Sequence, residues 1–284
     1  MIPAKFDYVR PSTVDEAVAA LVAAGEDAKV LGGGQSLMPV LRLRMGEPSV
    51  VVDTTRIDEM KGITDAGDAI VIGAGTTHDA VAKSDLVRQH AALLAAATDT
   101  VADRQIRHRG TVGGAMAHAD PAGDQPPVAL AMGASFTIAG PSGRRSVPAS
   151  EFFVDYFTTA VGPDEVLVSV SVPKHTGWGA HYEKFNRTAQ AWAIVGVAAT
   201  VRMDGGSIAE AEVGLTNMGP GPVKATAVEQ ALVGASTMAA ISAAASHAAE
   251  GTSPNSDIHA ESDYREHLAR VLTARAVAEA AGIS

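Results

Sequence analysis

The chain has 284 residues, 46% of them apolar and 19% charged, and a formal charge of −10 at pH 7. This length suits two or three packed units. The acidic balance, without any run of Lys or Arg, argues against nucleic acid or an anionic membrane surface as a partner. There is no cysteine, which excludes disulfides, thiolate nucleophiles and cysteine-bound zinc or iron–sulfur sites. An organic cofactor must therefore carry any redox chemistry on this chain.

The sequence predicts no membrane span, because no apolar stretch reaches the roughly 20 residues that a span requires. The opening segment, residues 1–7, lacks the charged-then-apolar pattern of a secretion signal. We therefore expect a cytoplasmic location.

The first 56 or so residues alternate between helix and strand signals. A capping-box pattern at 12–16 predicts a helix whose apolar face extends to Val22 and which Gly25 can close. Short buried strands are predicted at 28–31 and 50–53. This alternation is typical of a small α/β unit.

A second unit is expected to begin near Ile57. Its predicted elements are a strand at 69–74, a helix capped by Thr76 with Asp79, a helix at 86–97, and strands at 135–139 and 166–172. The segment 111–124 is polar and rich in glycine, and we expect a long irregular connection there. Such segments inside compact domains are usually functional or disordered.

The pattern changes after about His175. Strands are predicted at 182–185, 194–202 and 208–215, and Ala-rich helices near 224–232, 237–249 and 264–281, with a loop at 251–256. The C-terminal part is therefore expected to combine a small sheet with helices.

A first glycine segment, residues 32–37 (GGGQSL), follows the predicted strand at 28–31. Glycines leave backbone N–H groups accessible, and converging N–H dipoles bind phosphate oxygens; Gln35 and Ser36 add side-chain donors. The spacing matches neither the phosphate loop of nucleotide hydrolases nor the Gly-x-Gly-x-x-Gly dinucleotide motif. By itself, such a segment is more often just a turn.

A second glycine segment, residues 109–114 (RGTVGG), has the same chemistry. Small residues let the backbone approach a ligand, and Thr111 adds a hydroxyl. Two such segments in one chain can hold one extended diphosphate from both sides, which favours a cofactor site over a pair of turns.

Other polar groups nearby allow different interpretations. His118, Asp120 and Asp124, with His108, could bind a divalent metal, although Asp120 could instead cap a helix that begins near Pro126.

Two further clusters stand out in the sequence. The arginines 104, 107 and 109 form either a solvated face or a docking surface for a partner or for the adenosine of a cofactor. The aromatic cluster, residues 152, 153, 156 and 157, is expected to pack in a core, with a contact between subunits as the alternative.

Four segments occur in a fixed order: residues 29–37 (KVLGGGQSL), 109–114 (RGTVGG), 119–124 (ADPAGD) and 182–185 (YEKF). Together they resemble the FAD-binding medium subunit of the molybdenum hydroxylases, the family that includes carbon monoxide dehydrogenase and xanthine dehydrogenase. The resemblance covers essentially the whole chain.

The chain departs from this family's pattern at three places. Gly32 replaces a common alanine, Gln35 replaces a histidine, and residues 187–192 lack an acidic residue that often follows the last of the four segments. A flavin contact from residues 187–192 is therefore not expected.

The resemblance implies an α+β fold of the p-cresol methylhydroxylase type, in which two α+β subdomains hold FAD between them. A C-terminal domain with a small sheet and helices would cover the isoalloxazine region. The implied boundaries are 1–175 for the FAD-binding domain, with subdomains at about 1–56 and 57–175, and 176–284 for a C-terminal domain of the carbon monoxide dehydrogenase flavoprotein type.

The resemblance also implies which residues bind FAD. Residues 31–37 and 111–115 would line the diphosphate, and Asp124 would lie near the ribityl or diphosphate region. Leu167 would pack against the flavin ring, and Lys184 would lie at its polar edge, where a positive charge stabilises the reduced anionic flavin. The expected FAD-binding residues are Lys29, Leu31, Gly32, Gly33, Gly34, Gln35, Ser36, Leu37, Thr111, Gly113, Gly114, Ala115, Asp124, Leu167 and Lys184. No catalytic or metal-binding residue is expected.

The implied function is electron transfer within a complex. A large subunit with the molybdenum cofactor would oxidise the substrate, and a small subunit with [2Fe–2S] clusters would pass the electrons to FAD on this chain. The expected assembly is a dimer of heterotrimers, and the final acceptor is NAD, oxygen or a quinone-linked carrier. Two alternatives are a self-sufficient FAD-dependent oxidoreductase of the same fold and, less favoured, a metal-dependent hydrolase.

Overall fold

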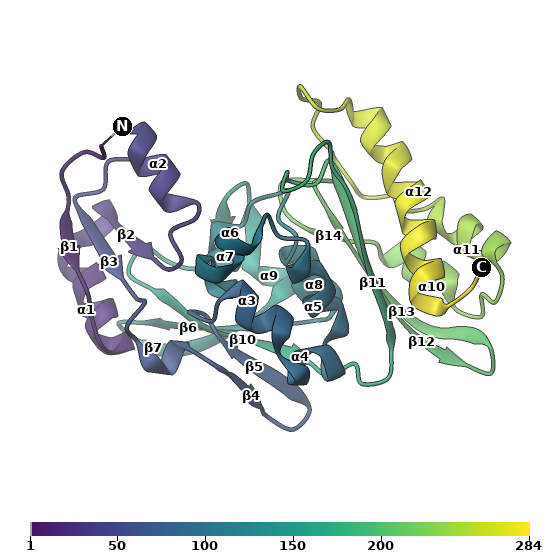
Figure 1. The fold of residues 1–284 in the computed structure, drawn as a ribbon, viewed down its shortest axis with the longest axis horizontal. Helices are drawn as coiled ribbons and strands as arrows, with labels where there is room; N and C mark the ends of the chain where they lie inside the picture. Colours follow the sequence, from purple (N-terminus) through teal and green to yellow (C-terminus); the bar gives the residue numbers. More distant parts are fainter. Residues whose placement is uncertain (1) are drawn as a thin grey trace.

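The computed structural model describes residues 2–284. The chain forms an elongated molecule with an N-terminal unit at one end, a central unit, and a C-terminal unit at the other end (Figure 1). Each unit contains one sheet of three or more strands.

The N-terminal unit is built on a parallel sheet with strand order β1-β3-β2. Its elements are β1 (Asp7–Val9), α1 (Val14–Ala24), a 3-10 turn (Gly25–Asp27), β2 (Ala28–Leu31), α2 (Leu37–Leu43) and β3 (Val50–Asp53). The Thr13 hydroxyl accepts from the Glu16 N–H, and the Glu16 carboxylate accepts from the Ser12 N–H at 2.8 Å. The predicted capping pattern is thus confirmed. The prediction for Val22 is wrong, since its side chain is 52% exposed at the edge of the helix face.

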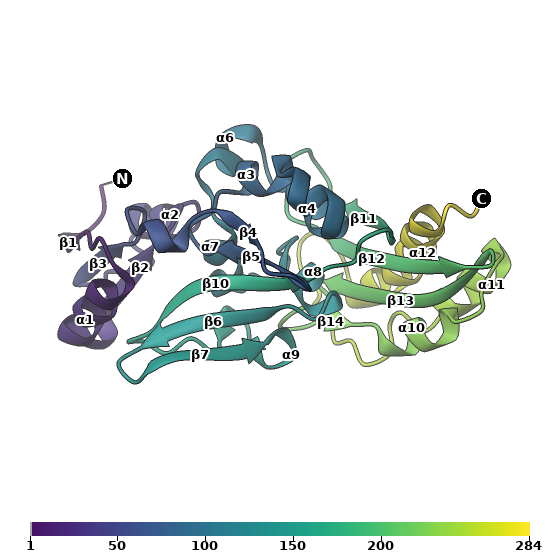
Figure 2. The same cartoon turned by 90° about the horizontal axis from the view of Figure 1, so that it is seen from below.

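The central unit is built on an antiparallel sheet with strand order β4-β5-β10-β6-β7. Its strands are β4 (Ile63–Asp65), β5 (Ala69–Gly73), β6 (Ser135–Gly140), β7 (Gly143–Pro148) and β10 (Val166–Pro173), with a small β8 (Phe153–Asp155) and β9 (Thr158–Thr159) pair beside them. Its helices are a 3-10 turn (Asp58–Met60), α3 (His78–Lys83), α4 (Asp85–His90), α5 (Ala92–Asp99), α6 (Arg104–Arg109), α7 (Val112–His118), α8 (Pro126–Ala131) and α9 (Ala149–Phe152). Helices α3, α4, α6 and α7 lie on one face of this sheet (Figure 2).

Two predictions for the central unit are wrong in detail. Thr77, not Thr76, caps α3, because the Thr76 hydroxyl donates to the Gly62 carbonyl of a different segment. The predicted helix at 86–97 is divided into α4 and α5 at Ala91, whose φ of −140° leaves the helical region.

The C-terminal unit is an antiparallel sheet with strand order β11-β12-β13-β14. Its elements are β11 (Gly179–Phe185), β12 (Val195–Asp204), β13 (Ser207–Thr216), β14 (Val223–Lys224), α10 (Thr226–Leu232), α11 (Met238–Ala245) and α12 (Ser262–Ala281). Helices α10 and α12 pack on this sheet, while α5 and α8 of the central unit contact it as well.

Alternate residues of β12 belong to two different hydrophobic cores. Ala198 is fully buried in the core of the N-terminal and central units, and its neighbours Val197 and Ala199 are fully buried in the core under α10 to α12. Since side chains alternate across a strand, the C-terminal sheet serves both cores. This sharing fixes it firmly against the central unit.

The aromatic cluster is only partly in the core. Phe152 is fully buried and stacks on Phe136 with centroids 3.8 Å apart, and Phe153 packs against both rings. The core prediction is wrong for Tyr156 and Phe157, which are 41% and 56% exposed in the turn between β8 and β9. No helix among residues 2–284 is long and apolar enough to cross a membrane.

Candidate functional site

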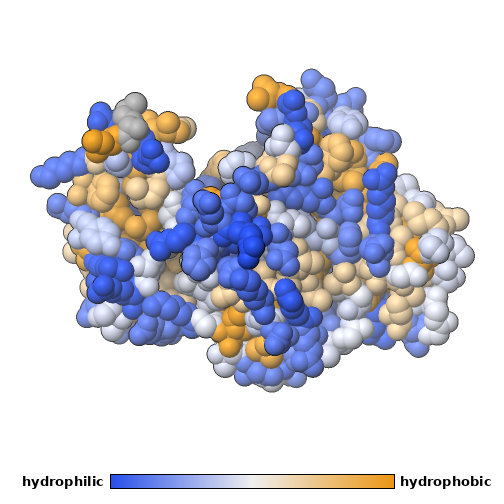
Figure 3. Space-filling model, viewed as in Figure 1, coloured by the Kyte–Doolittle hydropathy of each residue, from blue (hydrophilic) through white to orange (hydrophobic). Residues whose placement is uncertain are grey.

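A cavity of about 700 Å³ lies where the three units meet. Lys29 and Gly33 line it from the N-terminal unit, Thr111 and Leu167 from the central unit, and Lys184 from the C-terminal sheet. A space-filling view shows the surface indented between the N-terminal and central units (Figure 3). The residues that line the cavity are spread along the sequence from Leu21 to Trp192.

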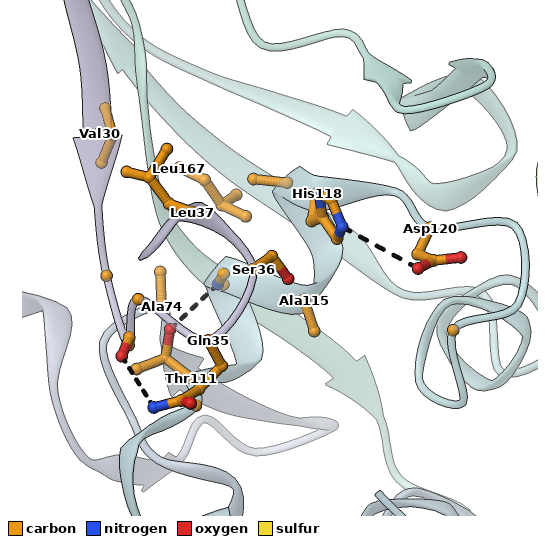
Figure 4. Close-up of a pocket in the computed structure, with 18 of the residues that line it drawn as sticks. Val30, Gln35, Ser36, Leu37, Ala74, Thr111, Ala115, His118, Asp120 and Leu167 are labelled. Carbon is orange, nitrogen blue, oxygen red and sulfur yellow. Dashed lines mark hydrogen bonds and ion pairs between the residues drawn. The ribbon is translucent and has the colours of Figure 1, made fainter. Parts of the chain in front are cut away.

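The two glycine segments lie side by side in this cavity (Figure 4). A Cβ atom on Gly33 would be 2.2 Å from the carbonyl oxygen of Arg109 and 2.6 Å from Cα of Gly110. A Cβ atom on Gly32 would be 3.1 Å from the Thr111 hydroxyl. Contacts this close leave no room for a side chain at position 33, so the glycine is required for the two segments to meet.

The first glycine segment leaves backbone donors free. Gly34 has a φ of +77°, which turns the chain between β2 and α2. Within the described chain, the N–H groups of residues 33–36 donate to no other protein group. The Gln35 side chain folds back onto its own segment, where its Nε2 donates to the Gly33 carbonyl at 3.3 Å. A row of unpaired N–H groups in a glycine loop is a suitable anion cradle.

The second glycine segment begins a helix. The Thr111 hydroxyl caps α7 by accepting from the Gly114 N–H at 3.1 Å, and a Cβ on Gly113 would be 2.3 Å from the Ala74 Cβ. The prediction of an irregular connection over 111–124 is therefore wrong for 112–118. The cap and the following Ala-Met-Ala sustain one short helix, although glycine weakens helices.

A buried ion pair lies at the end of the cavity near the C-terminal sheet. Nζ of Lys184 is 2.9 Å from a carboxylate oxygen of Asp124 and 3.2 Å from the Thr100 carbonyl, and both charged side chains are only 8% exposed. The Tyr182 hydroxyl donates to the other Asp124 oxygen at 2.8 Å. Burial raises the pKa of the Asp124 carboxyl, while Lys184 and Tyr182 oppose this effect. Lys184 thus lies at the cavity wall in an ion pair with Asp124.

Nearly all the predicted cofactor residues line this one cavity. The exception is Leu31, which is absent from the lining. The lining includes the predicted residues Lys29, Gly32, Gly33, Gly34, Gln35, Ser36, Leu37, Thr111, Gly113, Gly114, Ala115, Asp124, Leu167 and Lys184.

The cavity also contains residues that the sequence did not indicate. His78 is 5% exposed and lines the wall beside Gly110, and its Nδ1 has no hydrogen-bond partner. Burial, with the nearby Arg107, lowers the His78 pKa to about 4. Val101 and Trp192 line the cavity too. His78 and Val101 belong to no motif, so only the folded chain could reveal them. Trp192 belongs to the segment 187–192, from which no flavin contact was expected, yet Gln190, Ala191 and Trp192 line the cavity.

The alternative metal interpretation finds little geometric support. His118 Nε2 lies 4.0 Å from an Asp120 oxygen, and Asp124 is engaged by Lys184 and Tyr182. Among residues 2–284, no group of three or more His, Asp or Glu side chains is arranged to hold a metal ion. The predicted Asp120 cap is wrong as well: Asp120 accepts from the Ala122 N–H, and Gln125 stands at the N-cap of α8.

The arginines of α6 are not equivalent. Arg107 donates to the Val101 carbonyl at 2.8 Å and so supports a segment of the cavity wall. Arg104 and Arg109 make no ion pair within the described chain.

A cavity lined by two adjoining glycine segments, at the junction of the three units, is typical of a protein that holds a dinucleotide cofactor. Residues 4–175 match the family model of the FAD binding domain in molybdopterin dehydrogenase, and residues 180–280 match that of the CO dehydrogenase flavoprotein C-terminal domain. The chain therefore belongs to the family of FAD-binding subunits of molybdenum hydroxylases.

The chain is similar to proteins of this family along its entire length. It is 39% identical to the carbon monoxide dehydrogenase medium chain of Hydrogenophaga pseudoflava, over 98% of this chain and 97% of that protein. A structure of reconstituted CO dehydrogenase from Oligotropha carboxidovorans superposes with a TM-score of 0.96 at 36% identity and full coverage of both chains. Quinoline 2-oxidoreductase from Pseudomonas putida 86 gives 0.94 at 32% identity, with 99% of each chain covered. The predicted α+β fold, with an FAD-binding domain followed by a C-terminal domain, and the predicted FAD cofactor are confirmed.

Proposed function

We propose that the chain holds FAD in this cavity and serves as the electron-relay subunit between iron–sulfur clusters of a partner and an external acceptor. Bound FAD would supply the ability to accept electrons one at a time and release them in pairs, which no side chain of this cysteine-free protein provides. The single observation that carries the proposal is the direct contact of Gly33 with Arg109 and Gly110. This contact joins the two glycine segments into one continuous cradle in the cavity wall.

The residues present fit the cofactor in three respects. The free N–H groups of residues 33–36 can donate to diphosphate oxygens. Leu167 offers an apolar wall in the same cavity, as a flavin ring requires. Lys184 provides a cation at the wall. The proposed contacts are the cavity-lining residues named above, with Leu31 retained as a backbone contact beside Gly32.

The role proposed for the protein is to bind, orient and partly dehydrate the cofactor. The paired Lys184 and Asp124 bring no net charge to the cavity wall, so their effect on the cofactor depends on the direction in which their dipole points. No residue at the cavity is required to act as a general base for electron relay.

The proposed partners are a large subunit with the molybdenum cofactor and a small subunit with [2Fe–2S] clusters, in a dimer of heterotrimers in the cytoplasm. The full-length similarity to medium chains of carbon monoxide dehydrogenase supports this assembly. Both carbon monoxide dehydrogenase and quinoline 2-oxidoreductase are among its relatives, so the substrate depends on the partner. We further propose domain boundaries at 1–175 and 176–284, which the matched ranges 4–175 and 180–280 support.

The test is to purify the full chain with the proteins that accompany it and to record the visible absorption spectrum. Oxidised-flavin bands, with FAD released in one-to-one ratio on denaturation, support the proposal; a colourless chain that never takes up added FAD contradicts it. Mass spectrometry of the accompanying chains tests the partners. Reduction of the isolated chain by small substrates, without partners, would favour a self-sufficient oxidoreductase instead.

A further inference from the structure

The loop that carries Asp124 is held by the C-terminal sheet. The Thr216 hydroxyl, at the end of β13, lies 2.9 Å from the Pro121 carbonyl and 2.7 Å from the Gly123 carbonyl. The Asn217 N–H donates to the Pro121 carbonyl at 2.7 Å. Asp120, Gly123, Asp124 and Gln125 of this loop also line the cavity. One wall of the cavity is therefore placed by strands that belong to the other end of the chain.

Tyr182 makes a further buried contact with this loop. Its ring is 6% exposed and packs in the core of the central unit, and its hydroxyl donates to Asp124. Tyr182 is not among the cavity-lining residues, whereas Asp124 and Lys184 are. The tyrosine can therefore act on the cavity only through the carboxylate that it contacts.

The backbone around the tyrosine hydroxyl leaves space for it. Lys184 pairs with Gly196 on the neighbouring strand, and a Cβ atom on Gly196 would be 2.7 Å from the Tyr182 oxygen and 2.7 Å from Cγ2 of Thr216. Only glycine at this position lets the hydroxyl reach Asp124 unobstructed.

We propose that Tyr182 is a positioning residue for the cofactor cavity: its hydroxyl fixes the Asp124 carboxylate, which in turn fixes the Lys184 ammonium at the cavity wall. The inference rests on the proposed function, in that FAD is the ligand of this cavity. Asp124 then has one donor on each oxygen, Tyr182 on one and Lys184 on the other. With both donors in place, the carboxylate cannot rotate, and the ammonium is held between it and the Thr100 carbonyl.

Loss of the Tyr182 hydroxyl should change both the affinity for FAD and the flavin midpoint potential. Without the hydroxyl, one Asp124 oxygen is buried without a donor, and the ion pair loses its fixed orientation. The lost O–H dipole had its positive end toward the carboxylate, so its removal makes the electrostatic potential at this wall more negative. We expect Tyr182→Phe to weaken FAD retention about tenfold and to make the flavin midpoint potential more negative, because a hydrogen bond to a charged group contributes roughly this factor.

The experiment measures the FAD dissociation constant and midpoint potential of the full chain, in its native complex, for the wild type, Tyr182→Phe, Asp124→Asn and the double variant. Tyr264→Phe is the matched control, since it removes a tyrosine hydroxyl from a residue of α12 that is 45% exposed. The expected result is non-additivity: Tyr182→Phe has its effects in the wild type and almost none in the Asp124→Asn background. A purely structural role would produce the same loss in both backgrounds.

The outcomes separate the two proposals. If the wild type holds no FAD, the proposed function fails. If it holds FAD and Tyr182→Phe matches it in both measurements, or if the two substitutions act additively, the positioning role is overturned. Should Tyr182→Phe fail to fold, Gly196→Ala displaces the hydroxyl with the tyrosine in place and is judged by the same criteria.

Discussion

Gly33 of the first glycine segment lies so close to Arg109 of the second that a Cβ on Gly33 would be 2.2 Å from the Arg109 carbonyl oxygen. The contact is between backbones, so no side-chain rotation can relieve it. It couples the loop after β2 to the connection between α6 and α7 in the central unit. The shape of the cavity at this point therefore depends on a residue without a side chain.

Replacement of Gly33 by alanine should separate the two segments. Overpacking of this kind costs about 1–3 kcal/mol, and we expect FAD affinity to fall about 10- to 100-fold, measured by FAD titration of the apoprotein. Gly221→Ala is the matched control, because a Cβ there would meet Phe153 at an ordinary 3.5 Å. Wild-type affinity in Gly33→Ala would show that the cofactor does not lie between these segments.

Two substitutions at Thr111 can separate the effect of its hydroxyl from the effect of its side-chain shape. Its hydroxyl caps α7 through the Gly114 N–H, and the residue lines the cavity. Thr111→Val keeps the shape but loses the oxygen, so we expect a loss of about 1 kcal/mol in the free energy of unfolding, with weaker FAD retention. Thr111→Ser keeps the oxygen and should restore most of both. Equal behaviour of the two variants in chemical denaturation and FAD titration would contradict the capping role.

Lys184 should raise the flavin potential even though it is paired. Lys184→Met removes the cation and leaves the buried Asp124 carboxylate without its partner. At a pH at which Asp124 stays ionised despite its raised pKa, the cavity wall then gains negative charge. The midpoint potential should fall by about 30 mV or more, the two-electron equivalent of about 1.4 kcal/mol. FAD retention by this variant allows the potential to be measured by titration with redox dyes.

Two comparisons test the Lys184 prediction. Lys61→Met removes an ammonium from an exposed ion pair with Asp58 and should leave the potential unchanged. Lys184→Met combined with Asp124→Asn removes both charges and should recover part of the lost potential. An unchanged potential in Lys184→Met alone would remove Lys184 from this role.

Much of this architecture follows from local sequence rules. The strands at 28–31 and 50–53 lie at their predicted bounds, because each is a short, mainly apolar run bordered by turn residues. The prediction that 28–31 is buried is wrong for Lys29 and Val30, which are exposed. The glycine segments were recognisable because their chemistry requires small residues in a row. The resemblance to a family then connected positions as distant as Gly33 and Lys184.

What the sequence could not indicate is set by tertiary contacts. Nothing in the order of residues says that Lys184 meets Asp124, or that Tyr182 donates to the same carboxylate. The helix at 112–118 was missed because two adjacent glycines argue against a helix, and only the cap by Thr111 and the packing of Gly113 on Ala74 explain it. His78 was missed because one buried histidine has no pattern.

His78 should make the protein sensitive to acid. Its ring is buried and has a pKa of about 4, against an ordinary value of 6.5. Because the folded state favours the neutral ring, its contribution to stability is fully present above pH 6.5 and is lost as the pH falls from there toward 4. The difference corresponds to about 3 kcal/mol in the free energy of unfolding.

The measurement is urea denaturation of the wild type and of His78→Gln, whose amide stays neutral, between about pH 7 and pH 4. The wild type should lose about 3 kcal/mol more than the variant over this range, whereas His259→Gln, at an exposed position, should follow the wild type. Parallel curves for the wild type and His78→Gln would show that the ring is not held neutral, and that protonation at the cavity wall carries no cost.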